Sequence, residues 1–287
     1  MIIQSPLAWM GDRLNRARLT VGSADREQYW PAQASQTGPV TVRRIGLGDL
    51  RTALARGLDD FAANRTDVIF LCLLYPLVGL VLGRLASGYG VLPLLFPLAS
   101  GFALVGPVAA IGLNEMSRRR ELGAEVGWAD AFGVLRSPSI GAICGLALLL
   151  VAIFLLWLVS AETIYAHTLG PQPPASIAAF AHDLCYTPSG WALIIIGVGV
   201  GFLFALLVLS ISVVAFPMLL DRNVRLETAV WTSVRTVQAN PGPMAMWGLL
   251  VAAGLVIGSL PGLLGLVVVL PVFGHATWHL YRAVVAR

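Results

Sequence analysis

The sequence predicts an all-α fold, a polytopic membrane bundle of six transmembrane helices with both termini in the cytoplasm. Hydrophobic residues make up 57% of the 287 residues and charged residues only 12%, about half the charged fraction of a typical soluble domain. The apolar residues gather in runs of about 20, the length that crosses a bilayer core of about 30 Å. All the basic residues are arginines, and they gather on one side of these runs.

The chain divides into an N-terminal segment, residues 1–42, and a membrane domain, residues 43–287. The first segment carries the glycine, proline, serine and glutamine bias of a flexible chain, so we expect it to be disordered. Its short apolar stretch precedes the arginines, which is the wrong order for a cleaved signal, and Met10 is an alternative start. The expected spans are residues 67–87, 91–113, 140–160, 191–220, 244–260 and 262–281.

Orientation follows from the arginines. Placing successive loops on alternate sides leaves only Arg84 on the outer side, and the arginine-rich side is then cytoplasmic. The segment 160–190 becomes a hydrophilic outer loop without arginine. We expect its polar side chains to be solvated; a metal site or an acid–base pair is the alternative for Glu162, His167, His182 and Asp183.

Three copies of one unit, an interfacial amphipathic helix followed by a hairpin, are expected in the membrane domain. The amphipathic stretches are "LGDLRTALARGLDDFAANR", "VGWADAFGVLRSPS" and "LETAVWTSVRTVQANP". Each returning span carries a proline, and we predict helix kinks at Pro107, Pro217 and Pro271. Glycines four apart, such as Gly197 and Gly201, predict close helix packing, within the chain or between copies.

Two histidines and a run of arginines are the candidate site residues. His275 and His279 share one helix face and are candidate metal ligands, but two ligands fall short of a site. We therefore expect them to cap the last helix or to extend toward the cytoplasmic interface, and we expect no cofactor. We interpret the arginine run Arg118, Arg119 and Arg120 as a signal that sets the membrane orientation. Contact with anionic lipid or with a partner is the alternative.

The stretch "GPVAAIGLNEMSRRRELG", followed by "GWADAF", resembles a bacterial family of integral membrane proteins numbered twenty-one eighty-nine among the domains of unknown function. The early "RRIGLGDLRTALARGLDDF" and the closing "GLLGLVVVLPVFGHATWHLYRAVV" extend the resemblance from about residue 41 to the end. The resemblance implies a six-span inner-membrane protein and no particular activity. A haem-copper core is excluded, because only His275 and His279 lie near a span.

For function, we expect a non-catalytic accessory, assembly or scaffold component of the inner membrane. A transporter or channel for a small or amphipathic solute is the alternative, although spans two to five lack the ionisable residues typical of ion coupling. An enzyme is not expected, since no phosphate-binding loop, nucleophile elbow or paired cysteine ligands occur. The expected partners are the lipid bilayer and a membrane protein or a second copy, with no nucleic acid.

Overall fold

The computed structural model describes residues 40–63, 97–98, 106–108, 110–172, 174–261 and 263–286. Within these residues every named element is a helix, and the one β contact is an isolated antiparallel bridge between Val42 and Val285. The prediction of an all-α fold is therefore confirmed. The count of six spans, the threefold repeat and the side of the termini stay predictions.

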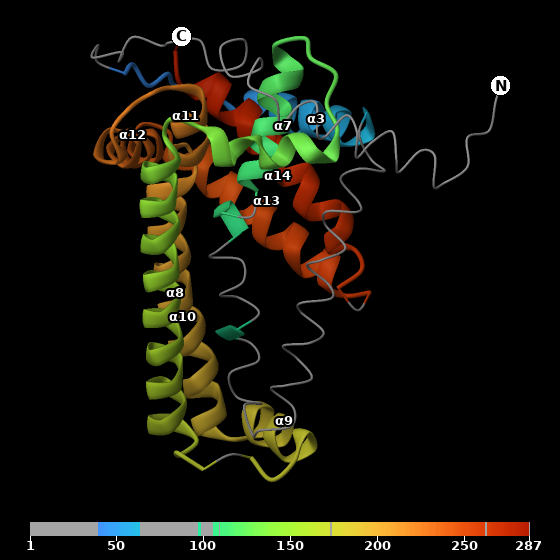
Figure 1. Ribbon diagram of the computed structural model, residues 1–287. Coiled ribbons are helices and arrows are strands. Elements are labelled where there is room, and N and C mark those ends of the chain that lie inside the picture. Colours follow the sequence, from blue (N-terminus) through green and yellow to red (C-terminus); the bar gives the residue numbers. More distant parts are fainter. Residues whose placement is uncertain are drawn as a thin grey trace, which may run out of the picture.

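A long hairpin projects from the rest of the described chain (Figure 1). Its two arms are α8 (Ile140–Thr168) and α10 (Pro188–Ser212), and the short α9 (Ile177–Tyr186) lies to one side of its far end. Three described segments are long and apolar enough to cross a membrane: Ile140–Thr168, Pro188–Asp221 and Pro241–Ser259. They overlap three of the predicted spans, because an unbroken apolar run of this length has few soluble alternatives.

The other predicted spans are described only in part. Span 67–87 lies outside the described residues, as does almost all of the N-terminal segment 1–42, and span 91–113 lies largely outside them. Span 262–281 corresponds to α14 (Leu266–Val284), which is not among the three candidate crossings. The first turns of α14 are apolar, whereas its last turns carry histidine, tyrosine and arginine.

The segment 160–190, which we expected to be a loop, is mostly helical. The first arm of the hairpin continues to Thr168, and α9 takes up a further ten residues. Polar residues fit into the extended arm because hydroxyl groups such as that of Thr163 donate to the backbone carbonyl four residues earlier. The Ser176 side chain accepts a hydrogen bond from the Ala179 amide and so caps the start of α9.

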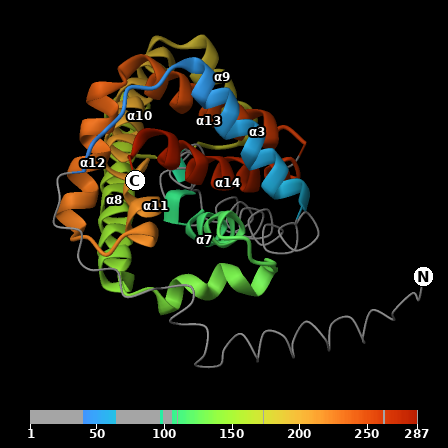
Figure 2. The ribbon, with the colours of Figure 1, turned by 90° about the horizontal axis from the view of Figure 1, so that it is seen from above.

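The remaining helices gather at the near end of the hairpin. Seen from above, α14 lies between α3 (Leu47–Ala63) and α7 (Ile111–Glu121) (Figure 2). Gly57 permits the close approach of α3 to α14, because a Cβ at this position would lie 2.6 Å from the backbone nitrogen of Ala276. We call α3, α7, α11 and α14 together the polar layer. The elements at this end are α3 (Leu47–Ala63), α7 (Ile111–Glu121), the 3₁₀ helix η2 (Trp128–Arg136), α11 (Ala215–Asp221), α12 (Leu226–Ala239), α13 (Pro241–Ser259) and α14.

The three stretches expected as interfacial α-helices differ in conformation. The first and third are α-helices, α3 and α12, but the second is the 3₁₀ helix η2. Gly133 in η2 lies against the Arg119 guanidinium, since a Cβ there would be 2.1 Å from Nη2. A side chain at position 133 would displace Arg119. The conformation of η2 therefore depends on its packing against α7 as well as on its amphipathic spacing.

The helix that enters the polar layer from the hairpin is interrupted just before Pro217. The second arm, α10, ends at Ser212, and α11 begins at Ala215. Proline has no amide to bond the carbonyl four residues earlier, which belongs to Val213. At the same interruption, the Val214 amide donates to Ser233 Oγ on α12 at 3.3 Å. Of the other two prolines, Pro271 lies inside α14 and Pro107 in the described stretch 106–108.

Candidate functional site

A buried carboxylate on α7 holds two arginines of the same helix. Glu115 is fully buried, and its Oε2 lies 2.7 Å from Nε of Arg118, while its Oε1 lies 2.7 Å from Nε of Arg119. A second carboxylate, Asp130 of η2, lies 2.6 Å from Nη1 of Arg119. The spacing of three and four residues places the α7 groups on one side of the helix. This cluster therefore joins η2 to α7 through charge-assisted hydrogen bonds.

A second cluster joins α3, α7 and α14 around Asp60. Its Oδ2 accepts the hydroxyl proton of Ser117 at 2.6 Å and the Nε2 proton of His279 at 2.8 Å. Arg120 on α7 reaches the other oxygen, Oδ1, at 3.0 Å. Burial alone would raise the pKa of Asp60, but the hydrogen bonds from His279 and Ser117 outweigh it and hold that pKa below its ordinary value.

The same geometry determines the proton position on His275. Because Ser117 donates its only hydroxyl proton to Asp60, the Nδ1–H of His275 must donate to Ser117 Oγ, 2.8 Å away. The ring is buried, and its Nε2 has no hydrogen-bond partner in the described chain. A second proton on Nε2 would be a buried charge without an acceptor, so the arrangement favours the neutral ring.

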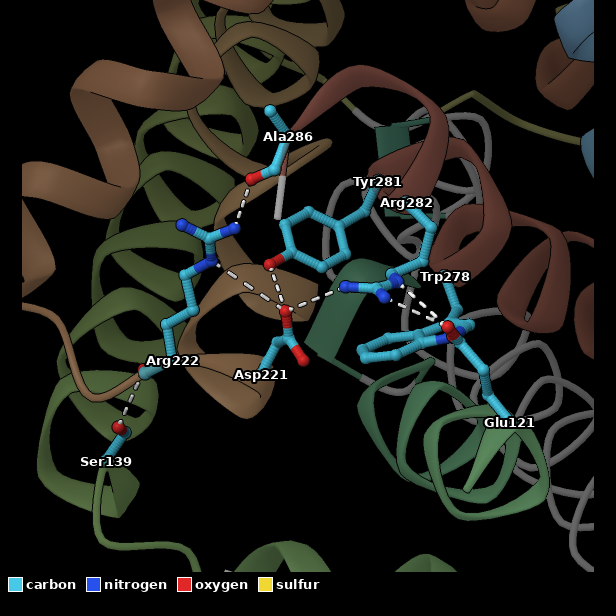
Figure 3. A network of polar contacts seen from close by, with 8 residues as sticks. All are labelled: Glu121, Ser139, Asp221, Arg222, Trp278, Tyr281, Arg282 and Ala286. Atoms are coloured by element: carbon cyan, nitrogen blue, oxygen red, sulfur yellow. Dashed lines mark hydrogen bonds and ion pairs between the residues drawn. The ribbon is translucent and has the colours of Figure 1, made fainter. Parts of the chain in front are cut away.

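A third cluster lies beside the C-terminal end of α14 (Figure 3). Asp221 of α11 accepts the Tyr281 hydroxyl at 2.6 Å and Nη1 of Arg282 at 3.2 Å. Glu121 of α7 accepts Nη2 of Arg282 at 3.0 Å and the indole N–H of Trp278 at 2.8 Å. Arg282 thus connects the carboxylates of two helices, and the cluster fixes α14 against α7 and α11.

These clusters show where the predicted arginine site lies. The side chains of Arg118 and Arg119 are buried among carboxylates of their own chain, rather than exposed to a lipid surface. Of the three predicted arginines only Arg120 has a substantially exposed side chain, at 39%. Contact with lipid or a partner therefore stays a prediction for Arg120, whereas Arg118 binds Glu115 within α7 and Arg119 joins α7 to η2.

The candidate histidines also have partners other than those we expected. His275 does not extend toward an interface, because it is 1% exposed and packed between helices. His279 is half-buried against Asp60. Among the described residues, no three histidine, cysteine, aspartate or glutamate side chains form a group suited to a metal ion.

The polar residues at the far end of the hairpin stay dispersed. The nearest pair is His182 with Asp183, whose Nδ1 and Oδ1 atoms are 3.8 Å apart, and both side chains are exposed. His167 donates through Nδ1 to the Thr163 carbonyl of its own helix. Glu162 is exposed. The structure does not bring these four residues together.

Sequence reasoning missed the acidic half of all three clusters. Glu115 was recognisable, because it precedes Arg118 and Arg119 by three and four residues on one helix. Asp60 carried no comparable signal, since its partner His279 is 219 residues away. A single sequence does not indicate which distant helices pack together.

A different set of arginines faces outward from α3 and the segment before it. Their side chains are exposed, and no hydrogen bond or ion pair joins them to the described part of the chain. The members of this outer arginine set are Arg43, Arg44, Arg51 and Arg56. Within the described residues, the arginines inside the polar layer are therefore paired, and those of the outer arginine set are not.

Comparison with known proteins identifies one family. Residues 95–221 match the family described as predicted integral membrane protein (DUF2189). No curated protein and no solved structure matches the chain. The matched residues begin after the first expected span and end with α11, so they include the Glu115 cluster and the whole hairpin. The resemblance seen in the sequence is thus supported over residues 95–221, where the chain is similar to a family of predicted integral membrane proteins of unknown function.

Proposed function

We propose that this protein is a non-catalytic accessory or scaffold component of the inner membrane, with the polar layer on the cytoplasmic side. The observation that carries the proposal is the division of the arginines into two sets. Those inside the layer neutralise buried carboxylates, and those of the outer arginine set have no partner in the described chain. A rigid internal network that presents free cations outward is suited to binding an anionic surface.

The face of α3 supports this proposal. One side of the helix is buried against the rest of the layer through Leu50, Ala53 and Gly57. The opposite side exposes Arg51 together with the large apolar side chain Leu58, which is 53% exposed. Basic and apolar groups on one exposed helix face favour a partner that offers both acidic and apolar groups.

We assign this partner to the class of membrane proteins with an acidic cytoplasmic surface. The Asp60 and Glu115 clusters join α3, α7 and η2 through their side chains, so the layer needs little reorganisation to bind. Anionic lipid shares the attraction to arginine, at about 1 kcal/mol for each basic residue near a membrane surface. The experiment must therefore distinguish a protein from lipid.

The test is purification of the tagged full chain from its own membranes in a mild detergent, followed by mass spectrometry of the bound proteins and lipids. We expect a stoichiometric protein partner that is lost from the double variant Arg51→Gln, Arg56→Gln. The matched control is Arg225→Gln with Arg235→Gln, which removes the same charge from exposed positions in and just before α12. The control should retain the partner.

Other results would overturn the proposal. A chain that emerges with anionic lipid alone, lost in the α3 variant, would make the outer arginine set a lipid site. A chain that emerges without a protein, and that raises the flux of a solute into liposomes above that of empty liposomes, would favour the transport alternative.

A further inference from the structure

The short helix α9 is held rigidly at the end of the hairpin. A Cβ at Gly190 would lie 2.1 Å from the Asp183 carbonyl oxygen, so α9 and the start of α10 are in close backbone contact. The indole N–H of Trp191 donates to the Cys185 carbonyl at 3.1 Å, and Thr187 caps the second arm by accepting the Gly190 amide. The position of α9 beside the far end of the hairpin in Figure 1 is therefore fixed by several contacts.

The sequence of α9 is amphipathic along its whole length. At 100° per residue, Ile177, Ala181 and Cys185 lie on one side of the helix, Asp183 lies on the opposite side, and His182 lies between them. No residue of α9 is buried, and the three residues of the apolar side are exposed. The described part of the chain therefore leaves this apolar side largely uncovered.

Two further observations indicate what covers it. The apolar surface of the adjoining arms is also exposed, so the side of α9 continues a surface that faces lipid. Tyr186 and Trp191, at 78% and 55% exposure, stand at the same end of the hairpin. Exposed tyrosine and tryptophan at the end of a membrane helix are typical of the boundary between headgroups and acyl chains.

We propose that α9 is an interfacial helix that lies in the outer boundary of the bilayer. Its apolar side, with Ile177, Ala181 and Cys185, contacts acyl chains, His182 lies at the edge of this side among the headgroups, and Asp183 faces water. The occupant of this surface is lipid rather than a protein. The hairpin is then anchored at both ends, by the polar layer on one side of the membrane and by α9 on the other.

The natural cysteine of α9 offers a direct test. The full chain, with Cys72→Ser and Cys144→Ser, is reconstituted in liposomes and carries a nitroxide label at Cys185. A matched sample carries Cys185→Ser and places the label at Asp183→Cys, on the opposite, polar side of the same helix, where the native side chain is 52% exposed. Label accessibility is measured to oxygen, which concentrates in the acyl region, and to a water-soluble nickel chelate.

We expect oxygen to exceed the nickel chelate at position 185, and the reverse at position 183. A label at Leu155→Cys, on the exposed surface of α8, is the positive control for lipid. Equal exposure of both α9 positions to the nickel chelate would overturn the proposal, because α9 would then stand clear of the membrane. Exclusion of both reagents at position 185 would overturn it too, because a protein surface would then cover the apolar side. Circular dichroism of each variant checks that the helices are retained.

Discussion

The polar layer and the α8–α10 hairpin solve the problem of burial in opposite ways. In the hairpin the large apolar side chains point outward, as with Phe202 at 65% exposure and Leu148 at 69%. In the polar layer charged side chains point inward, as with Glu115 at 0% and Arg118 at 6%. An apolar outer surface is stable only where lipid replaces water, and a charged interior only where each charge has a partner. The surface of the hairpin is therefore suited to lipid, whereas the charged interior of the polar layer is stabilised by the ion pairs within it.

The comparison also predicts where the molecule is sensitive to substitution. Taking an ion pair out of water costs free energy, and only its hydrogen bonds and mutual attraction offset that cost. Losing one partner leaves the other charge buried and unpaired. In the hairpin, by contrast, shortening a side chain that faces lipid exchanges one apolar contact for another. Substitutions in the layer should thus cost much more than those on the hairpin surface.

The largest effect is expected for Glu115→Gln. This change leaves Arg118 and Arg119 buried without their shared carboxylate, and breaking a buried ion pair costs about 3–5 kcal/mol. The measurement is thermal unfolding of the purified chain in one fixed detergent. The control is Glu125→Gln, which removes the same charge from an exposed position. Equal unfolding temperatures for the two variants would mean that the buried network adds no stability.

Asp60→Asn should have the next largest effect, and it should depend on pH. The pKa of Asp60 is lowered in the folded protein, so its contribution is complete above the unfolded pKa of about 3.9 and is lost as the pH falls through the folded pKa. At neutral pH we expect a loss of about 1.5–3 kcal/mol, the range for hydrogen bonds to a charged group.

Unfolding of this variant and of the original chain is compared from pH 7 down to pH 3. The difference between them should shrink below about pH 4, as Asp60 becomes protonated. The exposed neighbour Asp59, changed to Asn, is the control and should show a smaller difference throughout. A constant difference across this range would contradict an ionised Asp60 at the centre of its cluster.

Gly57→Ala tests the packing of α3 on α14 rather than its charges. The new Cβ would lie 2.6 Å from both the nitrogen and the Cβ of Ala276, so one helix must move. Such overpacking costs about 1–3 kcal/mol, although alanine is the better helix former. Gly48→Ala in the same helix meets no atom within 4 Å and should not destabilise. If the two variants unfold alike, the close contact between α3 and α14 is absent in solution.

How much of this was predictable from the sequence differs between the two regions. The hairpin arms and α13 overlap the predicted spans, because a run of apolar residues determines a membrane helix locally. The helical character of residues 177–186 was missed, although Ser176 and the spacing of Ile177 and Ala181 carry its signal. The sequence of a stretch this short and weakly polar is equally compatible with a helix and with a loop.

The layer was less predictable, since its contacts join residues far apart in the chain. The spacing of His275 and His279 indicated a shared helix face but gave no sign of Ser117, which is 158 residues from His275. Counting arginines gave the expected orientation, yet it did not separate the buried Arg118 from the exposed Arg51. The membrane topology can be inferred from where arginines lie along the chain. The burial of an arginine side chain, by contrast, depends on which helices pack against each other.

The smallest effect is expected for Leu203→Ala on the second arm of the hairpin, where the side chain is 61% exposed. Measured by unfolding in lipid, the change should be within about 0.5 kcal/mol, because acyl chains fill the lost contact. Leu219→Ala is the matched change in the layer; that side chain is fully buried, and the cost should be about 2–5 kcal/mol. A cost at Leu203 as large as that at Leu219 would mean that protein, not lipid, covers the hairpin. The scaffold would then bind its partner within the membrane rather than through α3.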